Sequence, residues 1–237
     1  MRPVAIFRFS PGDEPGRFAE WLDAHGRPWR LVSLHDGEPV PPDPQAFAGL
    51  GMMGGPMSVN DALPWNAPMQ ALLRAAVAKR VPVIGHCLGG QLLAKALGAR
   101  VGPARTPEIG WIDVEVCGDD AAREWFGGRR RFATFEWHYE AFALPAGAMR
   151  VLTNEHNENQ GYVLDGLHVG FQGHVEMTVP IARSWVALSG DELPPASTPT
   201  TQAAADILRD LPRRVAALNA VADAVYARWA TNLRDGA

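Results

Sequence analysis

Short apolar segments alternate with amphipathic helical patterns along the N-terminal part of the chain, and this alternation constrains the fold more than any other feature. The apolar segments expected to form strands are residues 4–9, 29–34, 47–53 and 81–84. The segments with apolar residues at helical spacing, expected to form helices, are residues 15–25, 65–80 and 88–97. Strands and helices in alternation predict an α/β fold with a mostly parallel sheet covered on both faces.

The middle and C-terminal parts of the chain differ from this pattern. Short strands are expected at residues 111–116, 131–137, 161–164 and 167–172, as antiparallel additions to the sheet or as a β-ribbon beside it. Residues 191–201 are rich in Pro and Ser, and helical spacing resumes over residues 203–233. We therefore expect one domain over residues 1–190, and a linker with a C-terminal helical extension over residues 191–237. The extension would pack on the domain or on a partner.

Composition limits the classes of protein to consider. The chain has 237 residues, of which 47% are hydrophobic and 20% charged, with a formal net charge of −4. These values fit one large globular domain and give no basic field for nucleic acid. The longest stretch without charged residues, 44–60, is broken by glycines and prolines, and Arg8 interrupts the first apolar run. Together with only two cysteines, this predicts a cytoplasmic protein without a membrane or nucleic-acid partner.

The segment Val83-Ile-Gly-His-Cys87-Leu-Gly-Gly-Gln91 places a cysteine between an expected buried strand and an expected helix. The glycines permit a tight turn that exposes the sulfur, as in a nucleophile elbow. A helix N-terminus also favours the thiolate form of cysteine. The alternative is a structural cysteine in an ordinary strand–helix junction.

A candidate base and its orienting carboxylate lie in the alternating segment 167–177. In a strand, His174 and Glu176 would share a face, so that Glu176 could hold the imidazole in one tautomer. The alternative is a half-exposed strand with a polar solvent face. His86 is a poor candidate for the base because adjacent residues project in different directions. Cys87, His174 and Glu176 together make a complete nucleophilic set.

Backbone N–H groups that could stabilise an oxyanion come from two places. Gly54 and Gly55 follow an expected strand, and Leu88 directly follows the candidate nucleophile. Residues without side chains leave their N–H groups open to a substrate. By itself, this segment could equally be a plain Gly-Pro loop.

Together these segments resemble the class I, triad-type glutamine amidotransferase domain, in its single-domain GMP-synthase-like group. Four blocks between residues 45 and 178 occur in the order of the family. They are Gly54-Gly55-Pro56, Gly85-His-Cys87-Leu-Gly89-Gly-Gln91, Asn159-Gln-Gly161-Tyr162 and Phe171-Gln172-Gly-His174-Val-Glu176. Trp137-His138-Tyr-Glu140 is also similar to a W-H-x-D/E segment of the group. The resemblance implies a flavodoxin-like fold and no cofactor.

The resemblance also implies a reaction and a role for each residue. Cys87 would attack the side-chain amide of glutamine, with the N–H groups of Gly55 and Leu88 holding the oxyanion. His174, oriented by Glu176, would protonate the departing ammonia, and water would hydrolyse the thioester. The residues implied in substrate binding are Gln91, Gly54, Asn159, Gly161 and Tyr162. Loss of one oxyanion donor costs about 3 kcal/mol of barrier in such sites, so changes at Gly55 should be severe.

The sequence departs from the family pattern at His86, where a small apolar residue is usual, and at Gly173 and Val175 around the candidate histidine. The only two lysines, Lys79 and Lys95, each follow alanine, so the chain has no G-K-[ST] phosphate loop. An acceptor of ammonia would therefore be bound by a synthase partner on another chain.

Other functions remain to be compared with this one. A γ-glutamyl peptidase or hydrolase would use the same triad with a wider pocket near Trp111, His138 and Tyr139. A binding or regulatory module of the same fold would need no reactive thiol. A dinucleotide site at residues 49–54 is excluded because this glycine segment does not lead into a helix. The histidines lack the helical spacing typical of a zinc site, and the arginines at 129–131 fit a solvated turn.

Overall fold

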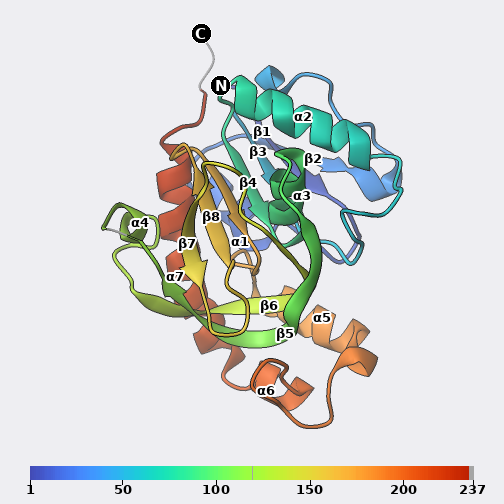
Figure 1. The fold of residues 1–237 in the computed structure, drawn as a ribbon, viewed down its shortest axis with the longest axis vertical. Helices are drawn as coiled ribbons and strands as arrows, with labels where there is room; N and C mark the ends of the chain where they lie inside the picture. Colours follow the sequence, from blue (N-terminus) through green and yellow to red (C-terminus); the bar gives the residue numbers. More distant parts are fainter. Residues whose placement is uncertain (119, 235–237) are drawn as a thin grey trace.

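The computed structural model describes residues 1–118 and 120–234, and among these nine strands form one sheet (Figure 1). The strand order is β2-β1-β3-β4-β9-β8-β7-β5-β6. The strands are β1 (Val4–Arg8), β2 (Trp29–Ser33), β3 (Gly49–Met52), β4 (Val83–His86), β5 (Val101–Val116), β6 (Arg131–Phe142), β7 (Met149–Thr153), β8 (Gly161–Leu164) and β9 (His168–Phe171). The mostly parallel α/β fold expected from the alternation is confirmed.

One half of the sheet is parallel and carries the helices expected from the alternation. β2, β1, β3, β4 and β9 run in the same direction, and β9 enters this group although it comes last in the sequence. The helices of this half are α1 (Gly16–Ala24), α2 (Asn66–Ala78) and α3 (Leu88–Ala96), with two short 3₁₀ helices, η1 (Leu34–Asp36) and η2 (Pro44–Ala46). Each α-helix lies within the range predicted for it.

The other half of the sheet is antiparallel. β8 pairs with β9, β7 with β8, and β5 with β7, and β6 then forms a long ribbon with β5. β5 and β6 are longer than predicted, and β5 includes a register irregularity between Pro103 and Glu108. β7 and the short helix α4 (Asp120–Glu124) were not predicted. Strand β7 exists because β5 and β8 supply partners on both of its edges.

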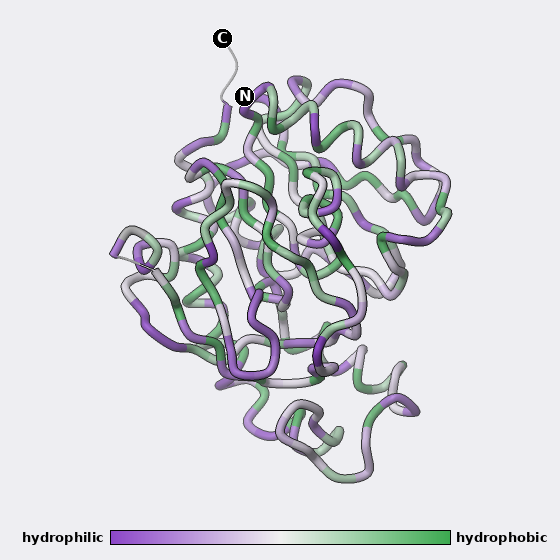
Figure 2. Tube along the Cα trace, viewed as in Figure 1, coloured by the Kyte–Doolittle hydropathy of each residue, from purple (hydrophilic) through white to green (hydrophobic). Residues whose placement is uncertain are grey.

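Alternate residues of the central strands enter two separate apolar layers. In β1, Val4 and Ile6 pack on one face of the sheet with Phe18 of α1, whereas Ala5 and Phe7 pack on the other face with residues of α2 and α3. Burial of both faces is what a parallel sheet requires. Figure 2 shows the hydrophobic residues concentrated along the strands and on the inward sides of the helices. No helix in the described ranges has both the length and the apolarity needed to cross a membrane.

The C-terminal part of the chain contains α5 (Val179–Leu188), η3 (Gly190–Glu192), α6 (Ala204–Leu208) and α7 (Leu211–Ala230). The helical pattern predicted over residues 203–233 is divided into two helices at Asp210, which has a left-handed conformation with φ of 52°. Pro212 lies in the first turn of α7, where its missing N–H costs no helical hydrogen bond. Helix α5 was not predicted.

Helix α7 packs on the domain. Its Tyr226 and Trp229 are fully buried, and their rings lie 4.9 and 5.6 Å from the ring of Phe18 in α1. Asp223 accepts a bidentate pair of hydrogen bonds, each 2.8 Å, from Arg17. In Figure 1, α7 lies on the side of the molecule opposite α2, whereas α5 and α6 project below the sheet. The Pro-rich segment before α6 is also attached, since Thr201 bridges to Ile109 of β5.

A buried carboxylate holds the antiparallel half together. Glu108 of β5 is fully buried and lies 3.1 Å from Nε2 of His138 in β6. The side-chain amides of Asn154 and Asn157 donate to its two oxygens at 2.6 and 2.7 Å, and that of Gln160 donates as well. Burial alone would raise the pKa of Glu108, but the hydrogen bonds and the attraction of His138 keep it below the usual value.

We expect Glu108→Gln to lower the free energy of unfolding by about 3 kcal/mol at neutral pH, because an amide cannot accept from all of these donors. The carboxylate stabilises the fold above its unfolded-state pKa of about 4.3 and loses this effect as the pH falls through the lower folded-state pKa. The difference in the free energy of unfolding between wild type and Glu108→Gln should therefore become smaller at acidic pH. Denaturant unfolding at several pH values measures this, with the exposed Glu115→Gln in the same strand as control. Equal stability of the two variants at neutral pH would contradict the prediction.

Candidate active site

The candidate site lies where the parallel strands end. The loops after β1, β3, β4 and β9 meet at the carboxyl edge of the sheet, because parallel neighbours end on the same side. A cavity of about 550 Å³ lies there. From these loops it is lined by Asp13, Gly55, Cys87 and His174. The pairing of β4 with β9 thus brings together two candidate residues that are far apart in the sequence.

Cys87 occupies the sharp turn between β4 and α3. Its φ of 47° and ψ of −108° are unusual for a residue with a side chain, and they direct the sulfur towards the cavity. Glycine is required on either side, because a Cβ at Gly85 would overlap the backbone of Gly89, and one at Gly90 would overlap that of Phe171. The elbow geometry expected from the sequence is therefore present at Cys87.

His174 lies beside Glu176 and lines the same cavity as Cys87, although not in a strand. β9 ends at Phe171, in agreement with the strand expected over residues 167–172, and residues 172–177 turn away from the sheet, so His174 and Glu176 do not share a strand face. Nδ1 of His174 lies 2.7 Å from Oε1 of Glu176, and the imidazole lines the same cavity as Cys87. The backbone N–H of His174 donates to the carbonyl of Phe135 in β6 at 2.8 Å. The turn therefore achieves the contact that strand alternation was expected to provide.

Electrostatics favour a charged pair at this position. Burial alone would lower the pKa of His174, but the charges of Glu176 and Cys87 and the hydrogen bonds to them raise it well above the usual value. Burial would raise the pKa of Glu176, but the neighbouring His86 and His174 keep it below the usual value. An imidazolium between a carboxylate and a sulfur is therefore favoured.

His86 has a role that the sequence did not reveal. Its side chain is fully buried on the α7 side of the sheet, where burial lowers its pKa. Nδ1 lies 3.1 Å from the carbonyl of Met52, and Nε2 lies 3.3 Å from the hydroxyl of Tyr226 and 4.0 Å from Oε2 of Glu176. His86 thus packs between Glu176 and helix α7 and does not act on the sulfur.

Two backbone N–H groups are available for an oxyanion. Gly55 lines the cavity, and Leu88 is the first residue of α3, at the positive end of the helix. Within the described residues, neither N–H donates to a protein acceptor. Gly54 permits the close approach of His174, because a Cβ at this position would overlap the imidazole. The position of these groups fits the expected oxyanion loop.

The candidate substrate-binding residues divide into two groups. Gln91 lines the cavity, and its amide donates to the carbonyl of Glu140 at 3.0 Å. Asn159, Gly161 and Tyr162 are not among the described residues that line it. Asn159 donates to the carbonyl of Phe142, Gly161 pairs with Phe171 in the sheet, and the hydroxyl of Tyr162 donates to the carbonyl of Gly90.

Asn159 lies in the loop before β8, and Gly161 and Tyr162 lie in β8, where the hydroxyl of Tyr162 contacts the elbow at Gly90. A role for these residues in binding substrate stays a prediction. Residues 137–140 of β6 line the cavity instead. The similarity of Trp137-His138-Tyr-Glu140 to a family segment was the signal that could have identified this wall.

The outer wall of the cavity was not predicted. It is formed by residues 10–13 after β1, and by Trp185, Leu188 and Glu192 from α5 and η3. The indole N–H of Trp185 donates to the carbonyl of Gly12 at 2.9 Å, and the Trp185 ring lies edge-on to His174 with centroids 4.7 Å apart. These segments are distant in sequence, and no local pattern joins them.

A second buried carboxyl group lies behind the site. Glu136 of β6 is fully buried, and neither oxygen has a hydrogen-bond partner in the structure. Burial and the nearby charge of Glu108 raise its pKa well above the usual value, so it is held as a neutral acid. A Cβ at Gly173 would overlap this carboxyl group, which explains why a bulkier residue is absent there. Among the described residues, no group of three His, Cys, Asp or Glu side chains is arranged to hold a metal ion.

Comparison with known proteins gives consistent results. The family model described as "Glutamine amidotransferase class-I" matches residues 37–183. The crystal structure of a glutamine amido transferase from Methylobacillus flagellatus covers 100% of this chain and 97% of its own, with a TM-score of 0.97 and 45% sequence identity.

Two curated relatives match parts of the chain. The glutamine amidotransferase-like protein YfeJ of Salmonella typhimurium is 28% identical over 76% of this chain and 78% of its own length. The glutamine-hydrolysing GMP synthase of Aeropyrum pernix is 37% identical over 44% of this chain, but the match spans only 19% of that much longer protein.

The two cysteines should differ in reactivity. We expect iodoacetamide at neutral pH to alkylate Cys87 at least about tenfold faster than Cys117, because burial raises the pKa of the Cys117 thiol. Glu176→Gln removes a charge that raises the pKa of His174, so it should slow alkylation of Cys87 and leave Cys117 unchanged. Mass spectrometry of each peptide over time measures both rates. Equal slow rates in the wild type would contradict the prediction and favour the binding module.

Proposed function

The chain belongs to the class-I glutamine amidotransferase family, and from this premise we propose that it hydrolyses a glutamine-type side-chain amide through a thioester on Cys87. The observation that carries the proposal is that Cys87 and His174 line one cavity at the carboxyl edge of the sheet, with Nδ1 of His174 2.7 Å from Glu176. A sulfur nucleophile, a base and an orienting carboxylate are the parts needed for covalent amide cleavage.

In the first half of the reaction, the thiolate of Cys87 attacks the amide carbon, and the N–H groups of Gly55 and Leu88 stabilise the oxyanion. The imidazolium of His174 gives its proton to the departing amine nitrogen as the C–N bond breaks. Glu176 holds the imidazole in the orientation that allows this transfer. The products of this half are a γ-glutamyl thioester and a free amine, which is ammonia when glutamine is the substrate.

In the second half, the now neutral His174 takes a proton from a water molecule that attacks the thioester. The thiolate of Cys87 leaves, and glutamate is released. The amino-acid end of the substrate lies near Gln91, where the carboxylate of Glu140 offers a partner for the α-ammonium group. No cofactor enters either half.

The fate of the ammonia is a second part of the proposal. A relative of this chain is named as a glutamine-hydrolysing GMP synthase, although this chain covers only 19% of it. We infer that, where glutamine is the substrate, the ammonia passes to an acceptor bound by a synthase on another chain. A γ-glutamyl hydrolase would use the same triad. The size of the cavity, about 550 Å³, favours this alternative because it leaves room for a substrate larger than glutamine.

Ammonia or amine release tests the reaction. The purified protein is assayed with L-glutamine and with a panel of γ-glutamyl amides, beside Cys87→Ala and the control Cys117→Ala. We expect turnover by the wild type and by Cys117→Ala, and a loss of at least about a thousandfold in Cys87→Ala, as for removal of a catalytic nucleophile. Turnover that persists in Cys87→Ala would overturn the proposed mechanism.

A further inference from the structure

The cavity is larger than free glutamine requires. At about 30 Å³ per non-hydrogen atom, the volume that a water molecule takes up in the liquid, glutamine fills about 300 Å³. The cavity measures about 550 Å³. The remaining space can hold a substituent on the substrate. The position of this space relative to the triad decides which end of the substrate carries the substituent.

The spare space adjoins the leaving-group side of the site. The departing nitrogen must lie beside His174, since His174 gives it a proton. His174 is flanked within the cavity by Trp185, with the ring centroids 4.7 Å apart, and by Asp13. Asp13 and His174 also both lie within contact distance of the place where a Cβ on Gly54 would be. The wall next to the leaving group therefore consists of Asp13 and Trp185.

The side chains that line the cavity include several carboxylates. Three carboxylates line the cavity, those of Asp13, Glu140 and Glu192, and none of the described residues that line it is a lysine or arginine. The carboxylate of Glu140 accepts from Ser58, whereas Asp13 lies beside His174 and Glu192 lines the same cavity next to Tyr139. Trp185 and Tyr139 add aromatic rings that favour a cation.

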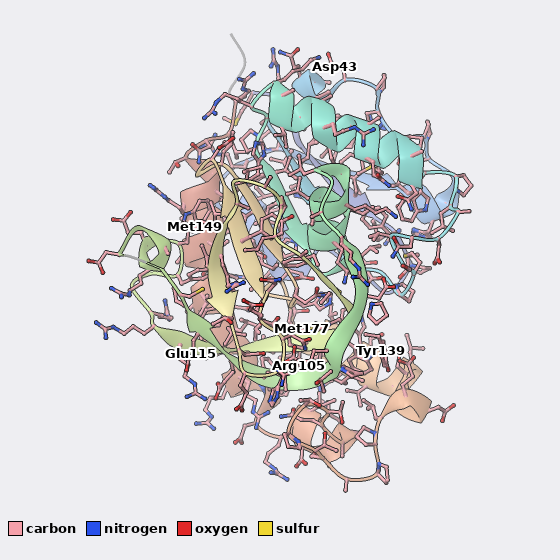
Figure 3. All side chains as sticks on the ribbon, in the orientation of Figure 1. Asp43, Arg105, Glu115, Tyr139, Met149 and Met177 are labelled. Carbon is pink, nitrogen blue, oxygen red and sulfur yellow. The ribbon has the colours of Figure 1, made fainter. Side chains whose placement is uncertain are left out.

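Tyr139 closes this part of the cavity. Its hydroxyl donates to Oε2 of Glu192 at 3.1 Å, which joins β6 to η3 across the mouth. Figure 3 shows Tyr139 close to α5, where the β5–β6 ribbon meets the C-terminal helices. The Ser10 hydroxyl donates to the carboxylate of Asp13, which fixes that side chain from the other side.

The wall is also separate from the part of the chain that the family model describes. That model matches residues 37–183, which include Cys87, His174 and Glu140, but not Asp13, Trp185 or Glu192. The segments that form the outer wall of the cavity therefore lie before and after the matched region.

We propose that the preferred substrates are γ-glutamyl amides of amines that carry a second, cationic group, with that cation held between Asp13, Glu192 and the ring of Trp185. This inference rests on the proposed function, because it uses the same acylation of Cys87. The γ-glutamyl C–N bond breaks, His174 protonates the nitrogen, and a diamine leaves in place of ammonia. Water then releases glutamate from the thioester, so that no further reactant is needed.

The burial of Asp13 favours a cationic partner for its carboxylate. Burial raises the pKa of Asp13 above its usual value, against the effects of Ser10 and His174. An ammonium group beside Asp13 would lower that pKa again and keep the carboxylate ionised. The site thus gains a favourable ion pair when a cationic amide binds.

Three amides of nearly equal length test the proposal: γ-glutamylputrescine, γ-glutamylpentylamide and γ-glutamyl-γ-aminobutyrate, which end in a cation, a methyl group and an anion. We expect kcat/KM for the cationic amide to exceed that for the neutral one at least about tenfold, and the anionic amide to be the poorest. Asp13→Asn should reduce the ratio of cationic to neutral kcat/KM to near one. The control Asp113→Asn, which removes an exposed carboxylate outside this cavity, should preserve the ratio.

The outcomes separate this inference from the proposed function. Equal kcat/KM for the three amides, or turnover of free glutamine alone, would overturn the inference and leave the Cys87 reaction intact. Calorimetric binding of the same amides to Cys87→Ala decides the case without turnover. Tighter binding of the cationic amide to that variant supports the inference even if no amide is hydrolysed, and binding without preference overturns it.

Discussion

The pairing of β4 with β9 is the constraint on which the rest of the site depends. These strands are distant in the sequence, but they are parallel neighbours with Gly85 opposite Gly170 and His86 opposite Phe171. Because both end at the same edge, the candidate nucleophile that follows β4 and the candidate base that follows β9 line the same cavity. The glycines at this position are part of the same constraint, since α3 and the end of β9 approach too closely for any Cβ at Gly90.

The buried polar groups around this pairing give the site its rigidity. Glu176 has one oxygen on His174 and the other facing His86, which in turn contacts Tyr226 of α7. The C-terminal helix therefore supports the carboxylate that orients the base, although it lies outside the matched family region. On the other side, Glu108 ties β5, β6 and the loop before β8 together. These contacts leave few alternative positions for His174.

The sequence predicted the parallel half of the fold because each apolar strand there must be buried on both faces. It also predicted the elbow, because a tight strand–helix turn needs glycines at fixed positions around Cys87. It could not predict β7, whose strand conformation depends on partners distant in the chain, nor the full length of β5, where Pro103 interrupts any local strand pattern. Residues 172–177 alternate like a strand, but they make only single backbone hydrogen bonds to neighbouring segments and no ladder, so the chain turns and brings His174 to Glu176.

The outer wall shows why the site as a whole cannot be read from motifs. Cys87, His174 and Glu176 lie in segments that the family shares, because bond cleavage demands the same groups whatever the amine. Asp13 and Trp185 come from segments before and after that region, and meet only because the indole of Trp185 donates to the carbonyl of Gly12. A leaving group beside His174 would contact these peripheral segments, because Asp13 and Trp185 line the cavity next to the imidazole. The proposed bond cleavage thus depends on residues of the matched region, whereas the proposed choice of leaving group depends on segments before and after it.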